Sequence, residues 1–207
     1  MNIILLSGGS GKRLWPLSND IRSKQFIKIF KQSNGTYESM LQRMYHNIKE
    51  IDKKGSITIA TSKSQVSAIF NQLGENVGIS VEPCRRDTFP AIALASEYLK
   101  DVRGIGLDEV VIVCPVDPYV KREYFEALQN LAEKYGYIIP KSNTATAMVS
   151  TFKEKPTVDL AKQYIEEGAL WNGGVFAFKL SYLIDKAHEL IDYIDYEDML
   201  VLYQFLV

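Results

Sequence analysis

Cysteine and histidine are scarce in this chain of 207 residues, which contains two of each. Cys84 and Cys114 lie far apart and form no CxxC pair, so we expect free thiols, with a disulfide as the minor alternative. His46 and His188 fall on expected helices away from the loops that carry the motifs, and we assign neither a catalytic role. No local spacing suggests a nucleophile beside a base, which argues against a hydrolase built on cysteine or histidine.

Long apolar segments and an excess of one charge are also missing. No stretch approaches the roughly twenty apolar residues of a membrane-spanning helix, and the apolar run at residues 3–6 is too short for a signal peptide. The formal net charge of -1 gives no general attraction to nucleic acid or to anionic membranes. We therefore expect a cytoplasmic protein that binds neither, and any anionic ligand must meet a local concentration of positive charge.

The composition is that of a soluble globular enzyme, with 46% hydrophobic and 24% charged residues. Short apolar runs alternate with stretches of helical period, which is typical of an α/β protein. The expected strands are residues 3–7, 57–60, 79–82, 110–114, 147–152 and 175–178, and the expected helices are residues 38–51, 63–73, 91–99, 121–134, 158–167 and 181–190. Because parallel strands present ligands at their carboxyl ends, functional residues should follow these strands.

The loop after the first expected strand is rich in glycine and basic residues. Gly8, Gly9 and Gly11 allow a tight turn that brings several backbone N–H groups onto one anion. Arg13 can hold phosphate oxygens through two parallel hydrogen bonds, and Lys24 can add a point charge. A tight turn with solvated basic residues is the alternative at this point.

Two familiar phosphate-binding loops do not fit this segment. A Walker A loop requires glycine where Leu6 stands and Ser or Thr where Arg13 follows Lys12. The dinucleotide-binding loop requires a third glycine where Leu14 stands, and Pro16 interrupts the helix that should follow. The loop therefore belongs to another class of anion site.

Residues 8–18 read GGSGKRLWPLS and residues 23–26 read SKQF. They resemble the signature of the sugar-phosphate nucleotidyltransferases, most specifically the mannose-1-phosphate guanylyltransferases, which have GGxGTRLWPLS and then PKQF. Lys12 in place of Thr and Ser23 in place of Pro are departures. The resemblance implies a Rossmann-like three-layer α/β/α fold with a mixed, mostly parallel sheet. It also implies that Arg13 and Lys24 are catalytic and that the glycines of the loop hold the nucleotide phosphates.

A second segment, residues 82–92 (EPCRRDTFPAI), resembles the family pattern EPxxRNTAPAI, which lies against the base and ribose of the nucleotide. The resemblance implies nucleotide-binding roles for Glu82, Arg86, Thr88 and Pro90. Asp87 replaces the usual Asn, so an acceptor-only group stands where an amide both donates and accepts, and base selectivity stays open. Taken without the resemblance, Asp87 or Thr88 could simply cap a helix that starts near Pro90.

Asp117 follows the strongly apolar strand expected at residues 110–114. The segment resembles the family's Ala-Asp-His element, whose Asp holds a magnesium ion, and a carboxylate at a strand end suits such a cation. Pro118 in place of His is a departure, and a plain Asp-Pro turn is the alternative. Mg²⁺ is thus the expected cofactor, with Asp117 as its ligand.

Two further segments, residues 153–156 (KEKP) and 171–176 (WNGGVF), resemble the family's VEKP and WNSGMF. The resemblance implies that Glu154 and Asn172 bind sugar hydroxyls and that Lys155 meets the sugar phosphate. Gly136, in the Tyr-Gly-Tyr-Ile turn, joins them as a sugar-phosphate-binding residue. The motifs occur in family order from residue 3 to residue 180.

The match to the family breaks at two places. Family members carry roughly two dozen additional residues before the Tyr-Gly-Tyr-Ile turn, where Lys134 here leads directly into it. No second metal-binding Asp is found in the tail, where Asp192, Asp195 and Asp198 favour a solvated acidic helix face. We expect a single nucleotidyltransferase domain over residues 1–207, lacking a segment near residue 134 and the family's C-terminal part.

The function implied is transfer of GMP from GTP to mannose 1-phosphate, with release of pyrophosphate. One alternative is the same reaction with another nucleoside triphosphate or another sugar 1-phosphate. The other is a non-catalytic regulator that binds a nucleotide sugar, which the departures at Asp87 and Pro118 and the absence of the second metal-binding Asp favour slightly. The sequence leaves the oligomeric state open, a homodimer included.

Overall fold

The computed structural model describes residues 1–9, 16–18, 23–134, 157–166 and 173–206. Within them, five strands form one sheet in the order β5-β4-β1-β6-β7. The first four are parallel and β7 runs antiparallel to β6, so the expected mixed, mostly parallel sheet is confirmed. The bounds are β1 (Asn2–Leu6), β4 (Ser56–Ser62), β5 (Gly78–Glu82), β6 (Val110–Pro115) and β7 (Phe176–Lys179), with a separate hairpin of β2 (Phe30–Lys31) and β3 (Tyr37–Glu38).

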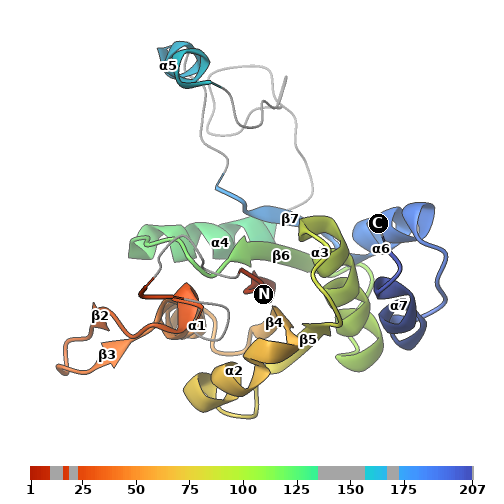
Figure 1. Cartoon of the computed structure of the whole chain (residues 1–207), viewed down its shortest axis with the longest axis horizontal. Coiled ribbons are helices and arrows are strands. Elements are labelled where there is room, and N and C mark those ends of the chain that lie inside the picture. Colours follow the sequence, from red (N-terminus) through yellow and green to blue (C-terminus); the bar gives the residue numbers. More distant parts are fainter. Residues whose placement is uncertain (10–15, 19–22, 135–156, 167–172, 207) are drawn as a thin grey trace.

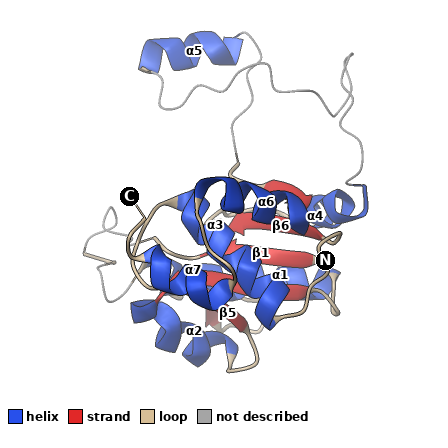
Figure 2. Ribbon diagram, turned by 90° about the vertical axis from the view of Figure 1, so that its right-hand side faces the viewer, coloured by secondary structure: helices blue, strands red, loops and turns tan. Residues whose placement is uncertain are grey.

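Helices lie against both faces of this sheet because its strands are apolar on both sides (Figures 1 and 2). Along β1, Ile3 and Leu5 join one core cluster and Ile4 joins the other, as the alternation of a strand requires. The first cluster is completed by α1 (Met40–Ile51), α2 (Val66–Leu73) and α4 (Arg122–Lys134). The second is completed by α3 (Thr88–Glu97) and α6 (Leu180–Leu190). The three layers expected from the sequence are therefore present.

Most expected elements are found with shifted ends. Helix α3 starts at Thr88 and is followed by a π-helical turn at Tyr98–Val102. A 3-10 turn, η3 (Lys63–Gln65), precedes α2, and α5 covers Val158–Glu166. The strand expected at residues 147–152 lies outside the described residues. In the part of the chain that is described, no helix has the length and apolar character needed to cross a bilayer.

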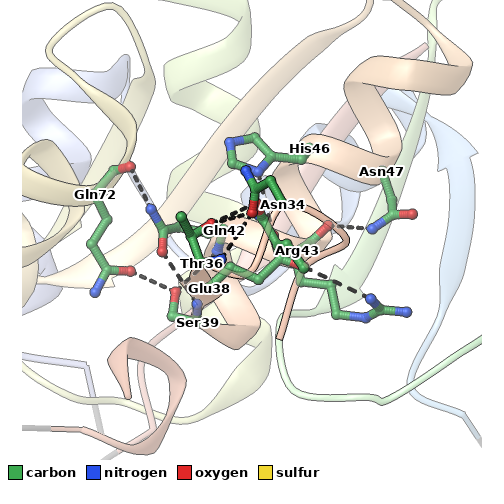
Figure 3. A network of polar contacts seen from close by, with 10 residues as sticks. Asn34, Thr36, Glu38, Ser39, Gln42, Arg43, His46, Asn47 and Gln72 are labelled. Carbon is green, nitrogen blue, oxygen red and sulfur yellow. Dashed lines mark hydrogen bonds and ion pairs between the residues drawn. The ribbon is translucent and has the colours of Figure 1, made fainter. Parts of the chain in front are cut away.

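The start of α1 ties the hairpin region to α2 (Figure 3). Ser39 and Gln42 form a capping box, which explains why α1 begins at Met40 instead of the expected residue 38. Gln42 Nε2 donates to the backbone oxygen of Gln72 at 3.1 Å, and Gln72 Nε2 donates to the backbone oxygen of Phe26 at 2.9 Å. These bonds fix the 3-10 turn η2 (Lys24–Phe26), and with it the position of Lys24.

The C-terminal helix α7 (Tyr196–Tyr203) packs on α3. The acidic residues behave only in part as expected. Asp192 and Asp195, which precede the helix, are exposed and the Asp195 side chain caps it, whereas Asp198 within the helix is half-buried. The tyrosines do not share this solvated face. Tyr193, Tyr196 and Tyr203 are all buried, because the apolar side of the helix covers α3. The sequence interpretation of the tail as a solvated acidic helix thus describes only one of its two faces.

Candidate active site

A cavity of about 390 Å³ opens at the carboxyl ends of β1, β4, β5 and β6. This is the edge at which parallel sheets present their ligands. The lining includes predicted site residues from four separate segments of the chain: Gly8, Gly9, Lys24, Glu82, Arg86, Thr88 and Asp117. Pro90 is not among the lining residues; it lies in the first turn of α3, where the missing N–H of proline leaves no helical bond unmade.

Gly8 and Gly9 form the part of the glycine-rich loop that is described. A Cβ atom at Gly8 would lie 3.2 Å from Oε1 of Glu82, whereas a Cβ at Gly9 would meet nothing within 4 Å. Glycine at position 8 therefore lets the end of β1 approach the carboxylate at the end of β5 closely. At Gly9, the open space leaves room for a ligand beside the backbone.

Two buried glutamines hold this loop from beneath. Gln25 Nε2 donates to the backbone oxygen of Ser7 at 2.9 Å, and Gln65 Nε2 donates to Oγ of Ser23 at 2.9 Å. Both amides also reach the backbone oxygen of Gly9, at 3.4 and 3.3 Å. Gln25 and Gln65 are 1% and 2% exposed, so these bonds are shielded from water. Sequence reasoning quoted Gln25 only as part of a motif and missed Gln65, which no motif marks.

Lys24 and Asp117, the predicted phosphate-binding cation and the predicted metal ligand, form an ion pair with each other. Their side chains are 32% and 40% exposed, so the pair is open to solvent at the cavity mouth. An exposed pair of this kind contributes little to stability, which leaves both groups available to a ligand. An anionic ligand can replace Asp117 as the partner of Lys24. That exchange leaves the Asp117 carboxylate free to bind a cation.

The described residues contain no group of three or more His, Cys, Asp or Glu side chains arranged to hold a metal ion. Within these residues, Asp117 is thus a carboxylate that belongs to no such group. This donor set fits Mg²⁺, which keeps several waters and is commonly bound by one or two carboxylates together with substrate phosphates.

Glu82 is a buried carboxyl group, 6% exposed, on the opposite wall. Burial raises its pKa, and this effect is only partly offset by the hydrogen bond from Tyr203 and by the charge of Arg85. The phenol O–H of Tyr203 donates to Glu82 Oε2 at 2.9 Å. Burial beside this carboxylate likewise raises the pKa of Tyr203, which keeps the phenol protonated and able to donate.

The turn from β5 to α3 carries two more predicted residues. Arg86 donates through its guanidinium to the backbone oxygens of Tyr203 and Gln204. Asp87 has a φ of 83°, a conformation rare outside glycine, and its side chain accepts from the backbone N–H of Thr88 at 2.7 Å. The capping role considered for Asp87 is thus confirmed, with the helix starting at Thr88.

The remaining predicted site residues lie outside the described residues: Gly11, Arg13, Gly136, Glu154, Lys155 and Asn172. Their roles stay predictions.

Neither histidine lines the cavity; His188 stacks on Tyr193 and His46 pairs with Glu38. Both cysteines are free thiols, Cys114 buried and Cys84 half-buried, and burial raises the pKa of Cys114 to about 12.

The chain is similar to several proteins of known name. It is 32% identical over 208 residues to the xanthan biosynthesis protein XanB of Xanthomonas campestris, a match that covers 88% of this chain and 43% of that protein. It is 28% identical over 217 residues to mannose-1-phosphate guanylyltransferase 2 of Escherichia coli O157:H7, covering 88% and 44%. The chain therefore spans less than half the length of these relatives.

Solved structures share the fold. A protein described as a mannose-1-phosphate geranyltransferase of Thermus thermophilus superposes with a TM-score of 0.68 at 23% identity, covering 99% of this chain and 67% of that one. HddC of Yersinia pseudotuberculosis, solved with GMP-PN, gives 0.54 at 16% identity, covering 89% and 79%. The family model described as nucleotidyl transferase matches residues 2–134 and 129–197. The chain thus belongs to the nucleotidyl transferase family.

Proposed function

We propose that this protein transfers a nucleotidyl group to a sugar 1-phosphate, specifically GMP from GTP to mannose 1-phosphate, releasing pyrophosphate. The observation that carries the proposal is the cavity that brings Gly8, Lys24, Glu82 and Asp117 together at the carboxyl edge of the sheet. Membership of the nucleotidyl transferase family supports the reaction type. The mannose-1-phosphate guanylyltransferase among the relatives supports the choice of base and sugar.

The reaction we infer is an in-line displacement at the α-phosphorus of the triphosphate. The attacking oxygen belongs to the phosphate of the sugar 1-phosphate, which is already ionised, so the protein need not supply a strong base. Lys24 would leave its ion pair with Asp117 and stabilise the charge that develops on the α-phosphate. Arg13 would hold the departing pyrophosphate. Mg²⁺ on Asp117 would supply further charge neutralisation when bound.

The choice of GTP also has chemical support in Glu82. A buried carboxylate at the end of β5 accepts hydrogen bonds and donates none when ionised. The guanine base presents two adjacent N–H donor groups on one edge, which complement such an acceptor, whereas adenine presents a ring acceptor there. We infer that Glu82 Oε1, on the side of Gly8, receives the base.

The test is a pyrophosphate-release assay on the chain with each nucleoside triphosphate, mannose or glucose 1-phosphate, and magnesium. GTP with mannose 1-phosphate is expected to give the highest kcat/KM. Lys24→Met and Arg13→Ala should each lower turnover on the order of 10²–10³-fold, as loss of a preorganised charge partner does. Lys28→Met is the matched control, because Lys28 is exposed and does not line the cavity. Equal activity of the Lys24 and Lys28 variants would refute the site.

A second candidate is a regulator that binds a nucleotide sugar without turning it over. Pro118 in place of the family His, next to the metal-ligand candidate Asp117, favours it. Asp87 in place of the family Asn points the same way. Tight binding of GDP-mannose with no pyrophosphate release from any triphosphate would select this function.

A further inference from the structure

The end of helix α7 reaches the candidate site from far along the chain. Tyr203 is completely buried, and its O–H bonds to Glu82, a residue 121 positions earlier in the sequence. Arg86 donates to the backbone oxygens of Tyr203 and Gln204. Two predicted nucleotide-binding residues, Glu82 and Arg86, therefore share contacts with a single two-residue segment. The match to the family model ends at residue 197, so this segment lies beyond it.

Both contacts fit the chemistry of their partners. Residues 203–204 lie at the carboxyl end of α7, where backbone oxygens lack helical partners and attract a cation such as Arg86. The buried carboxyl of Glu82 needs a donor to stay ionised, and the Tyr203 phenol supplies one. Because that bond occupies Oε2, it also orients the carboxyl group, with Oε1 on the side of Gly8.

We propose that Tyr203 is a positioning residue for Glu82, and that the end of α7 thereby sets the preference of the site for a base with adjacent N–H donors, such as guanine. The inference rests on the proposed binding of a nucleoside triphosphate in this cavity. Tyr203 contacts no base itself; it acts through the carboxyl group that does.

Among the described residues, the titratable groups that act on Glu82 come from α7 and from the loop after β5. Tyr203 from α7 and Arg85 from the loop after β5 both favour the ionised carboxylate, and burial opposes it. Arg86 and the half-buried Cys84 lie beside Tyr203. Removing the phenol O–H should therefore raise the pKa of Glu82 further. The site should then lose its preference for guanine at a higher pH than in the wild-type chain.

The test is Tyr203→Phe in the full chain, which keeps the ring and removes only the hydroxyl. Isothermal titration with GTP and with ATP reads base preference without requiring turnover. We expect GTP affinity to fall about tenfold, as for a lost hydrogen bond to a charged group, with ATP affinity nearly unchanged. The pH below which GTP affinity declines should also be higher in the variant than in the wild type. Tyr182→Phe is the matched control, since Tyr182 on α6 is 58% exposed.

A double variant separates positioning through Glu82 from a general packing effect. In a Glu82→Gln background the side chain at position 82 carries no charge, so adding Tyr203→Phe should change GTP affinity by less than about twofold. If Tyr203→Phe alone melts too low to be titrated, the double variant should fold again, since it buries no carboxylate. Equal and additive losses in both backgrounds, or an unchanged preference for GTP over ATP in Tyr203→Phe, would overturn the proposal.

The failure of the proposed function would look different. A wild-type chain that releases no pyrophosphate with any triphosphate contradicts the reaction, yet the titrations would still report whether Tyr203 controls base preference. Conversely, the wild-type chain could release pyrophosphate while Tyr203→Phe keeps the wild-type preference for GTP. That outcome would support the proposed reaction and contradict the proposed role of α7.

Discussion

The two walls of the cavity are built on opposite principles. On the side proposed to bind phosphates (the phosphate side), Lys24 and Asp117 are 32% and 40% exposed and form an ion pair that solvent can reach. On the side proposed to bind the base (the base side), Glu82 and Tyr203 are buried and joined by a hydrogen bond. Because solvent screens the Lys24–Asp117 pair, replacing one partner by a charged ligand costs little free energy. The Glu82–Tyr203 bond is buried, so breaking it costs much more. The difference suits the proposed reaction, in which the phosphates of the nucleotide change while its base does not.

The largest effect is expected from Asp117→Asn, which would break the phosphate side. If Asp117 is the carboxylate that holds Mg²⁺, turnover should fall on the order of 10²–10³-fold. In the absence of magnesium, the same substitution should tighten GTP binding, because Lys24 loses its internal partner. A pyrophosphate-release assay with magnesium measures turnover, and a titration without magnesium measures the affinity for GTP. If turnover falls but the variant binds GTP more weakly without magnesium, then GTP does not have to break the Lys24–Asp117 ion pair in order to bind.

An intermediate effect is expected beneath the glycine loop. Gln65→Leu keeps most of the side-chain volume but leaves Ser23 Oγ and the Gly9 backbone oxygen without this donor. The free energy of unfolding should fall by about 1–3 kcal/mol, as for buried groups left without partners. Chemical denaturation measures this loss. Asn47→Leu is the comparison, since Asn47 Nδ2 also donates to a backbone oxygen, that of Arg43 within α1, and Asn47 does not line the cavity. Only Gln65→Leu should also raise the KM for GTP.

The smallest effect concerns stability against pH on the base side. Because the pKa of Glu82 is raised in the folded state, the folded chain binds this proton more tightly than the unfolded chain. Stability therefore falls as pH rises from the unfolded pKa of the carboxyl through its higher folded value. Glu82→Gln has no ionisable group at this position and lacks this dependence on pH. Between the unfolded and the folded pKa of Glu82, the free energy of unfolding of the variant should therefore rise relative to that of the wild type. A stability difference that is independent of pH would show that the carboxyl is not held in a buried, desolvated state.

The sheet and the edge that carries the cavity could be predicted from the sequence. The apolar runs at β1, β4, β5 and β6 are strong local signals, and the rule for parallel strands then locates the residues that follow them. Gly8, Glu82 and Asp117 were found in this way and through the family motifs. The cap at Asp87 was also predictable, because capping depends on neighbouring residues only.

Other features of the site carried no such signal. Gln65 lies in a short 3-10 turn, and its role depends on Gly9 and Ser23 being folded against it. The tyrosines of α7 share a helix with exposed acidic residues, so the sequence pattern favoured a solvated element. Their burial follows from the docking of α7 on α3, which composition cannot report.

The sequence by itself determined the layered fold, the two glycines at the end of β1 and the residues that end each strand, because these depend on periodicity and on neighbouring side chains. Only the tertiary structure decided which groups meet. It pairs Lys24 with Asp117, seats two glutamines under Gly9, and brings Tyr203 to Glu82. These pairs are far apart along the chain, and contacts of that kind form only when packing of the whole core brings their elements together.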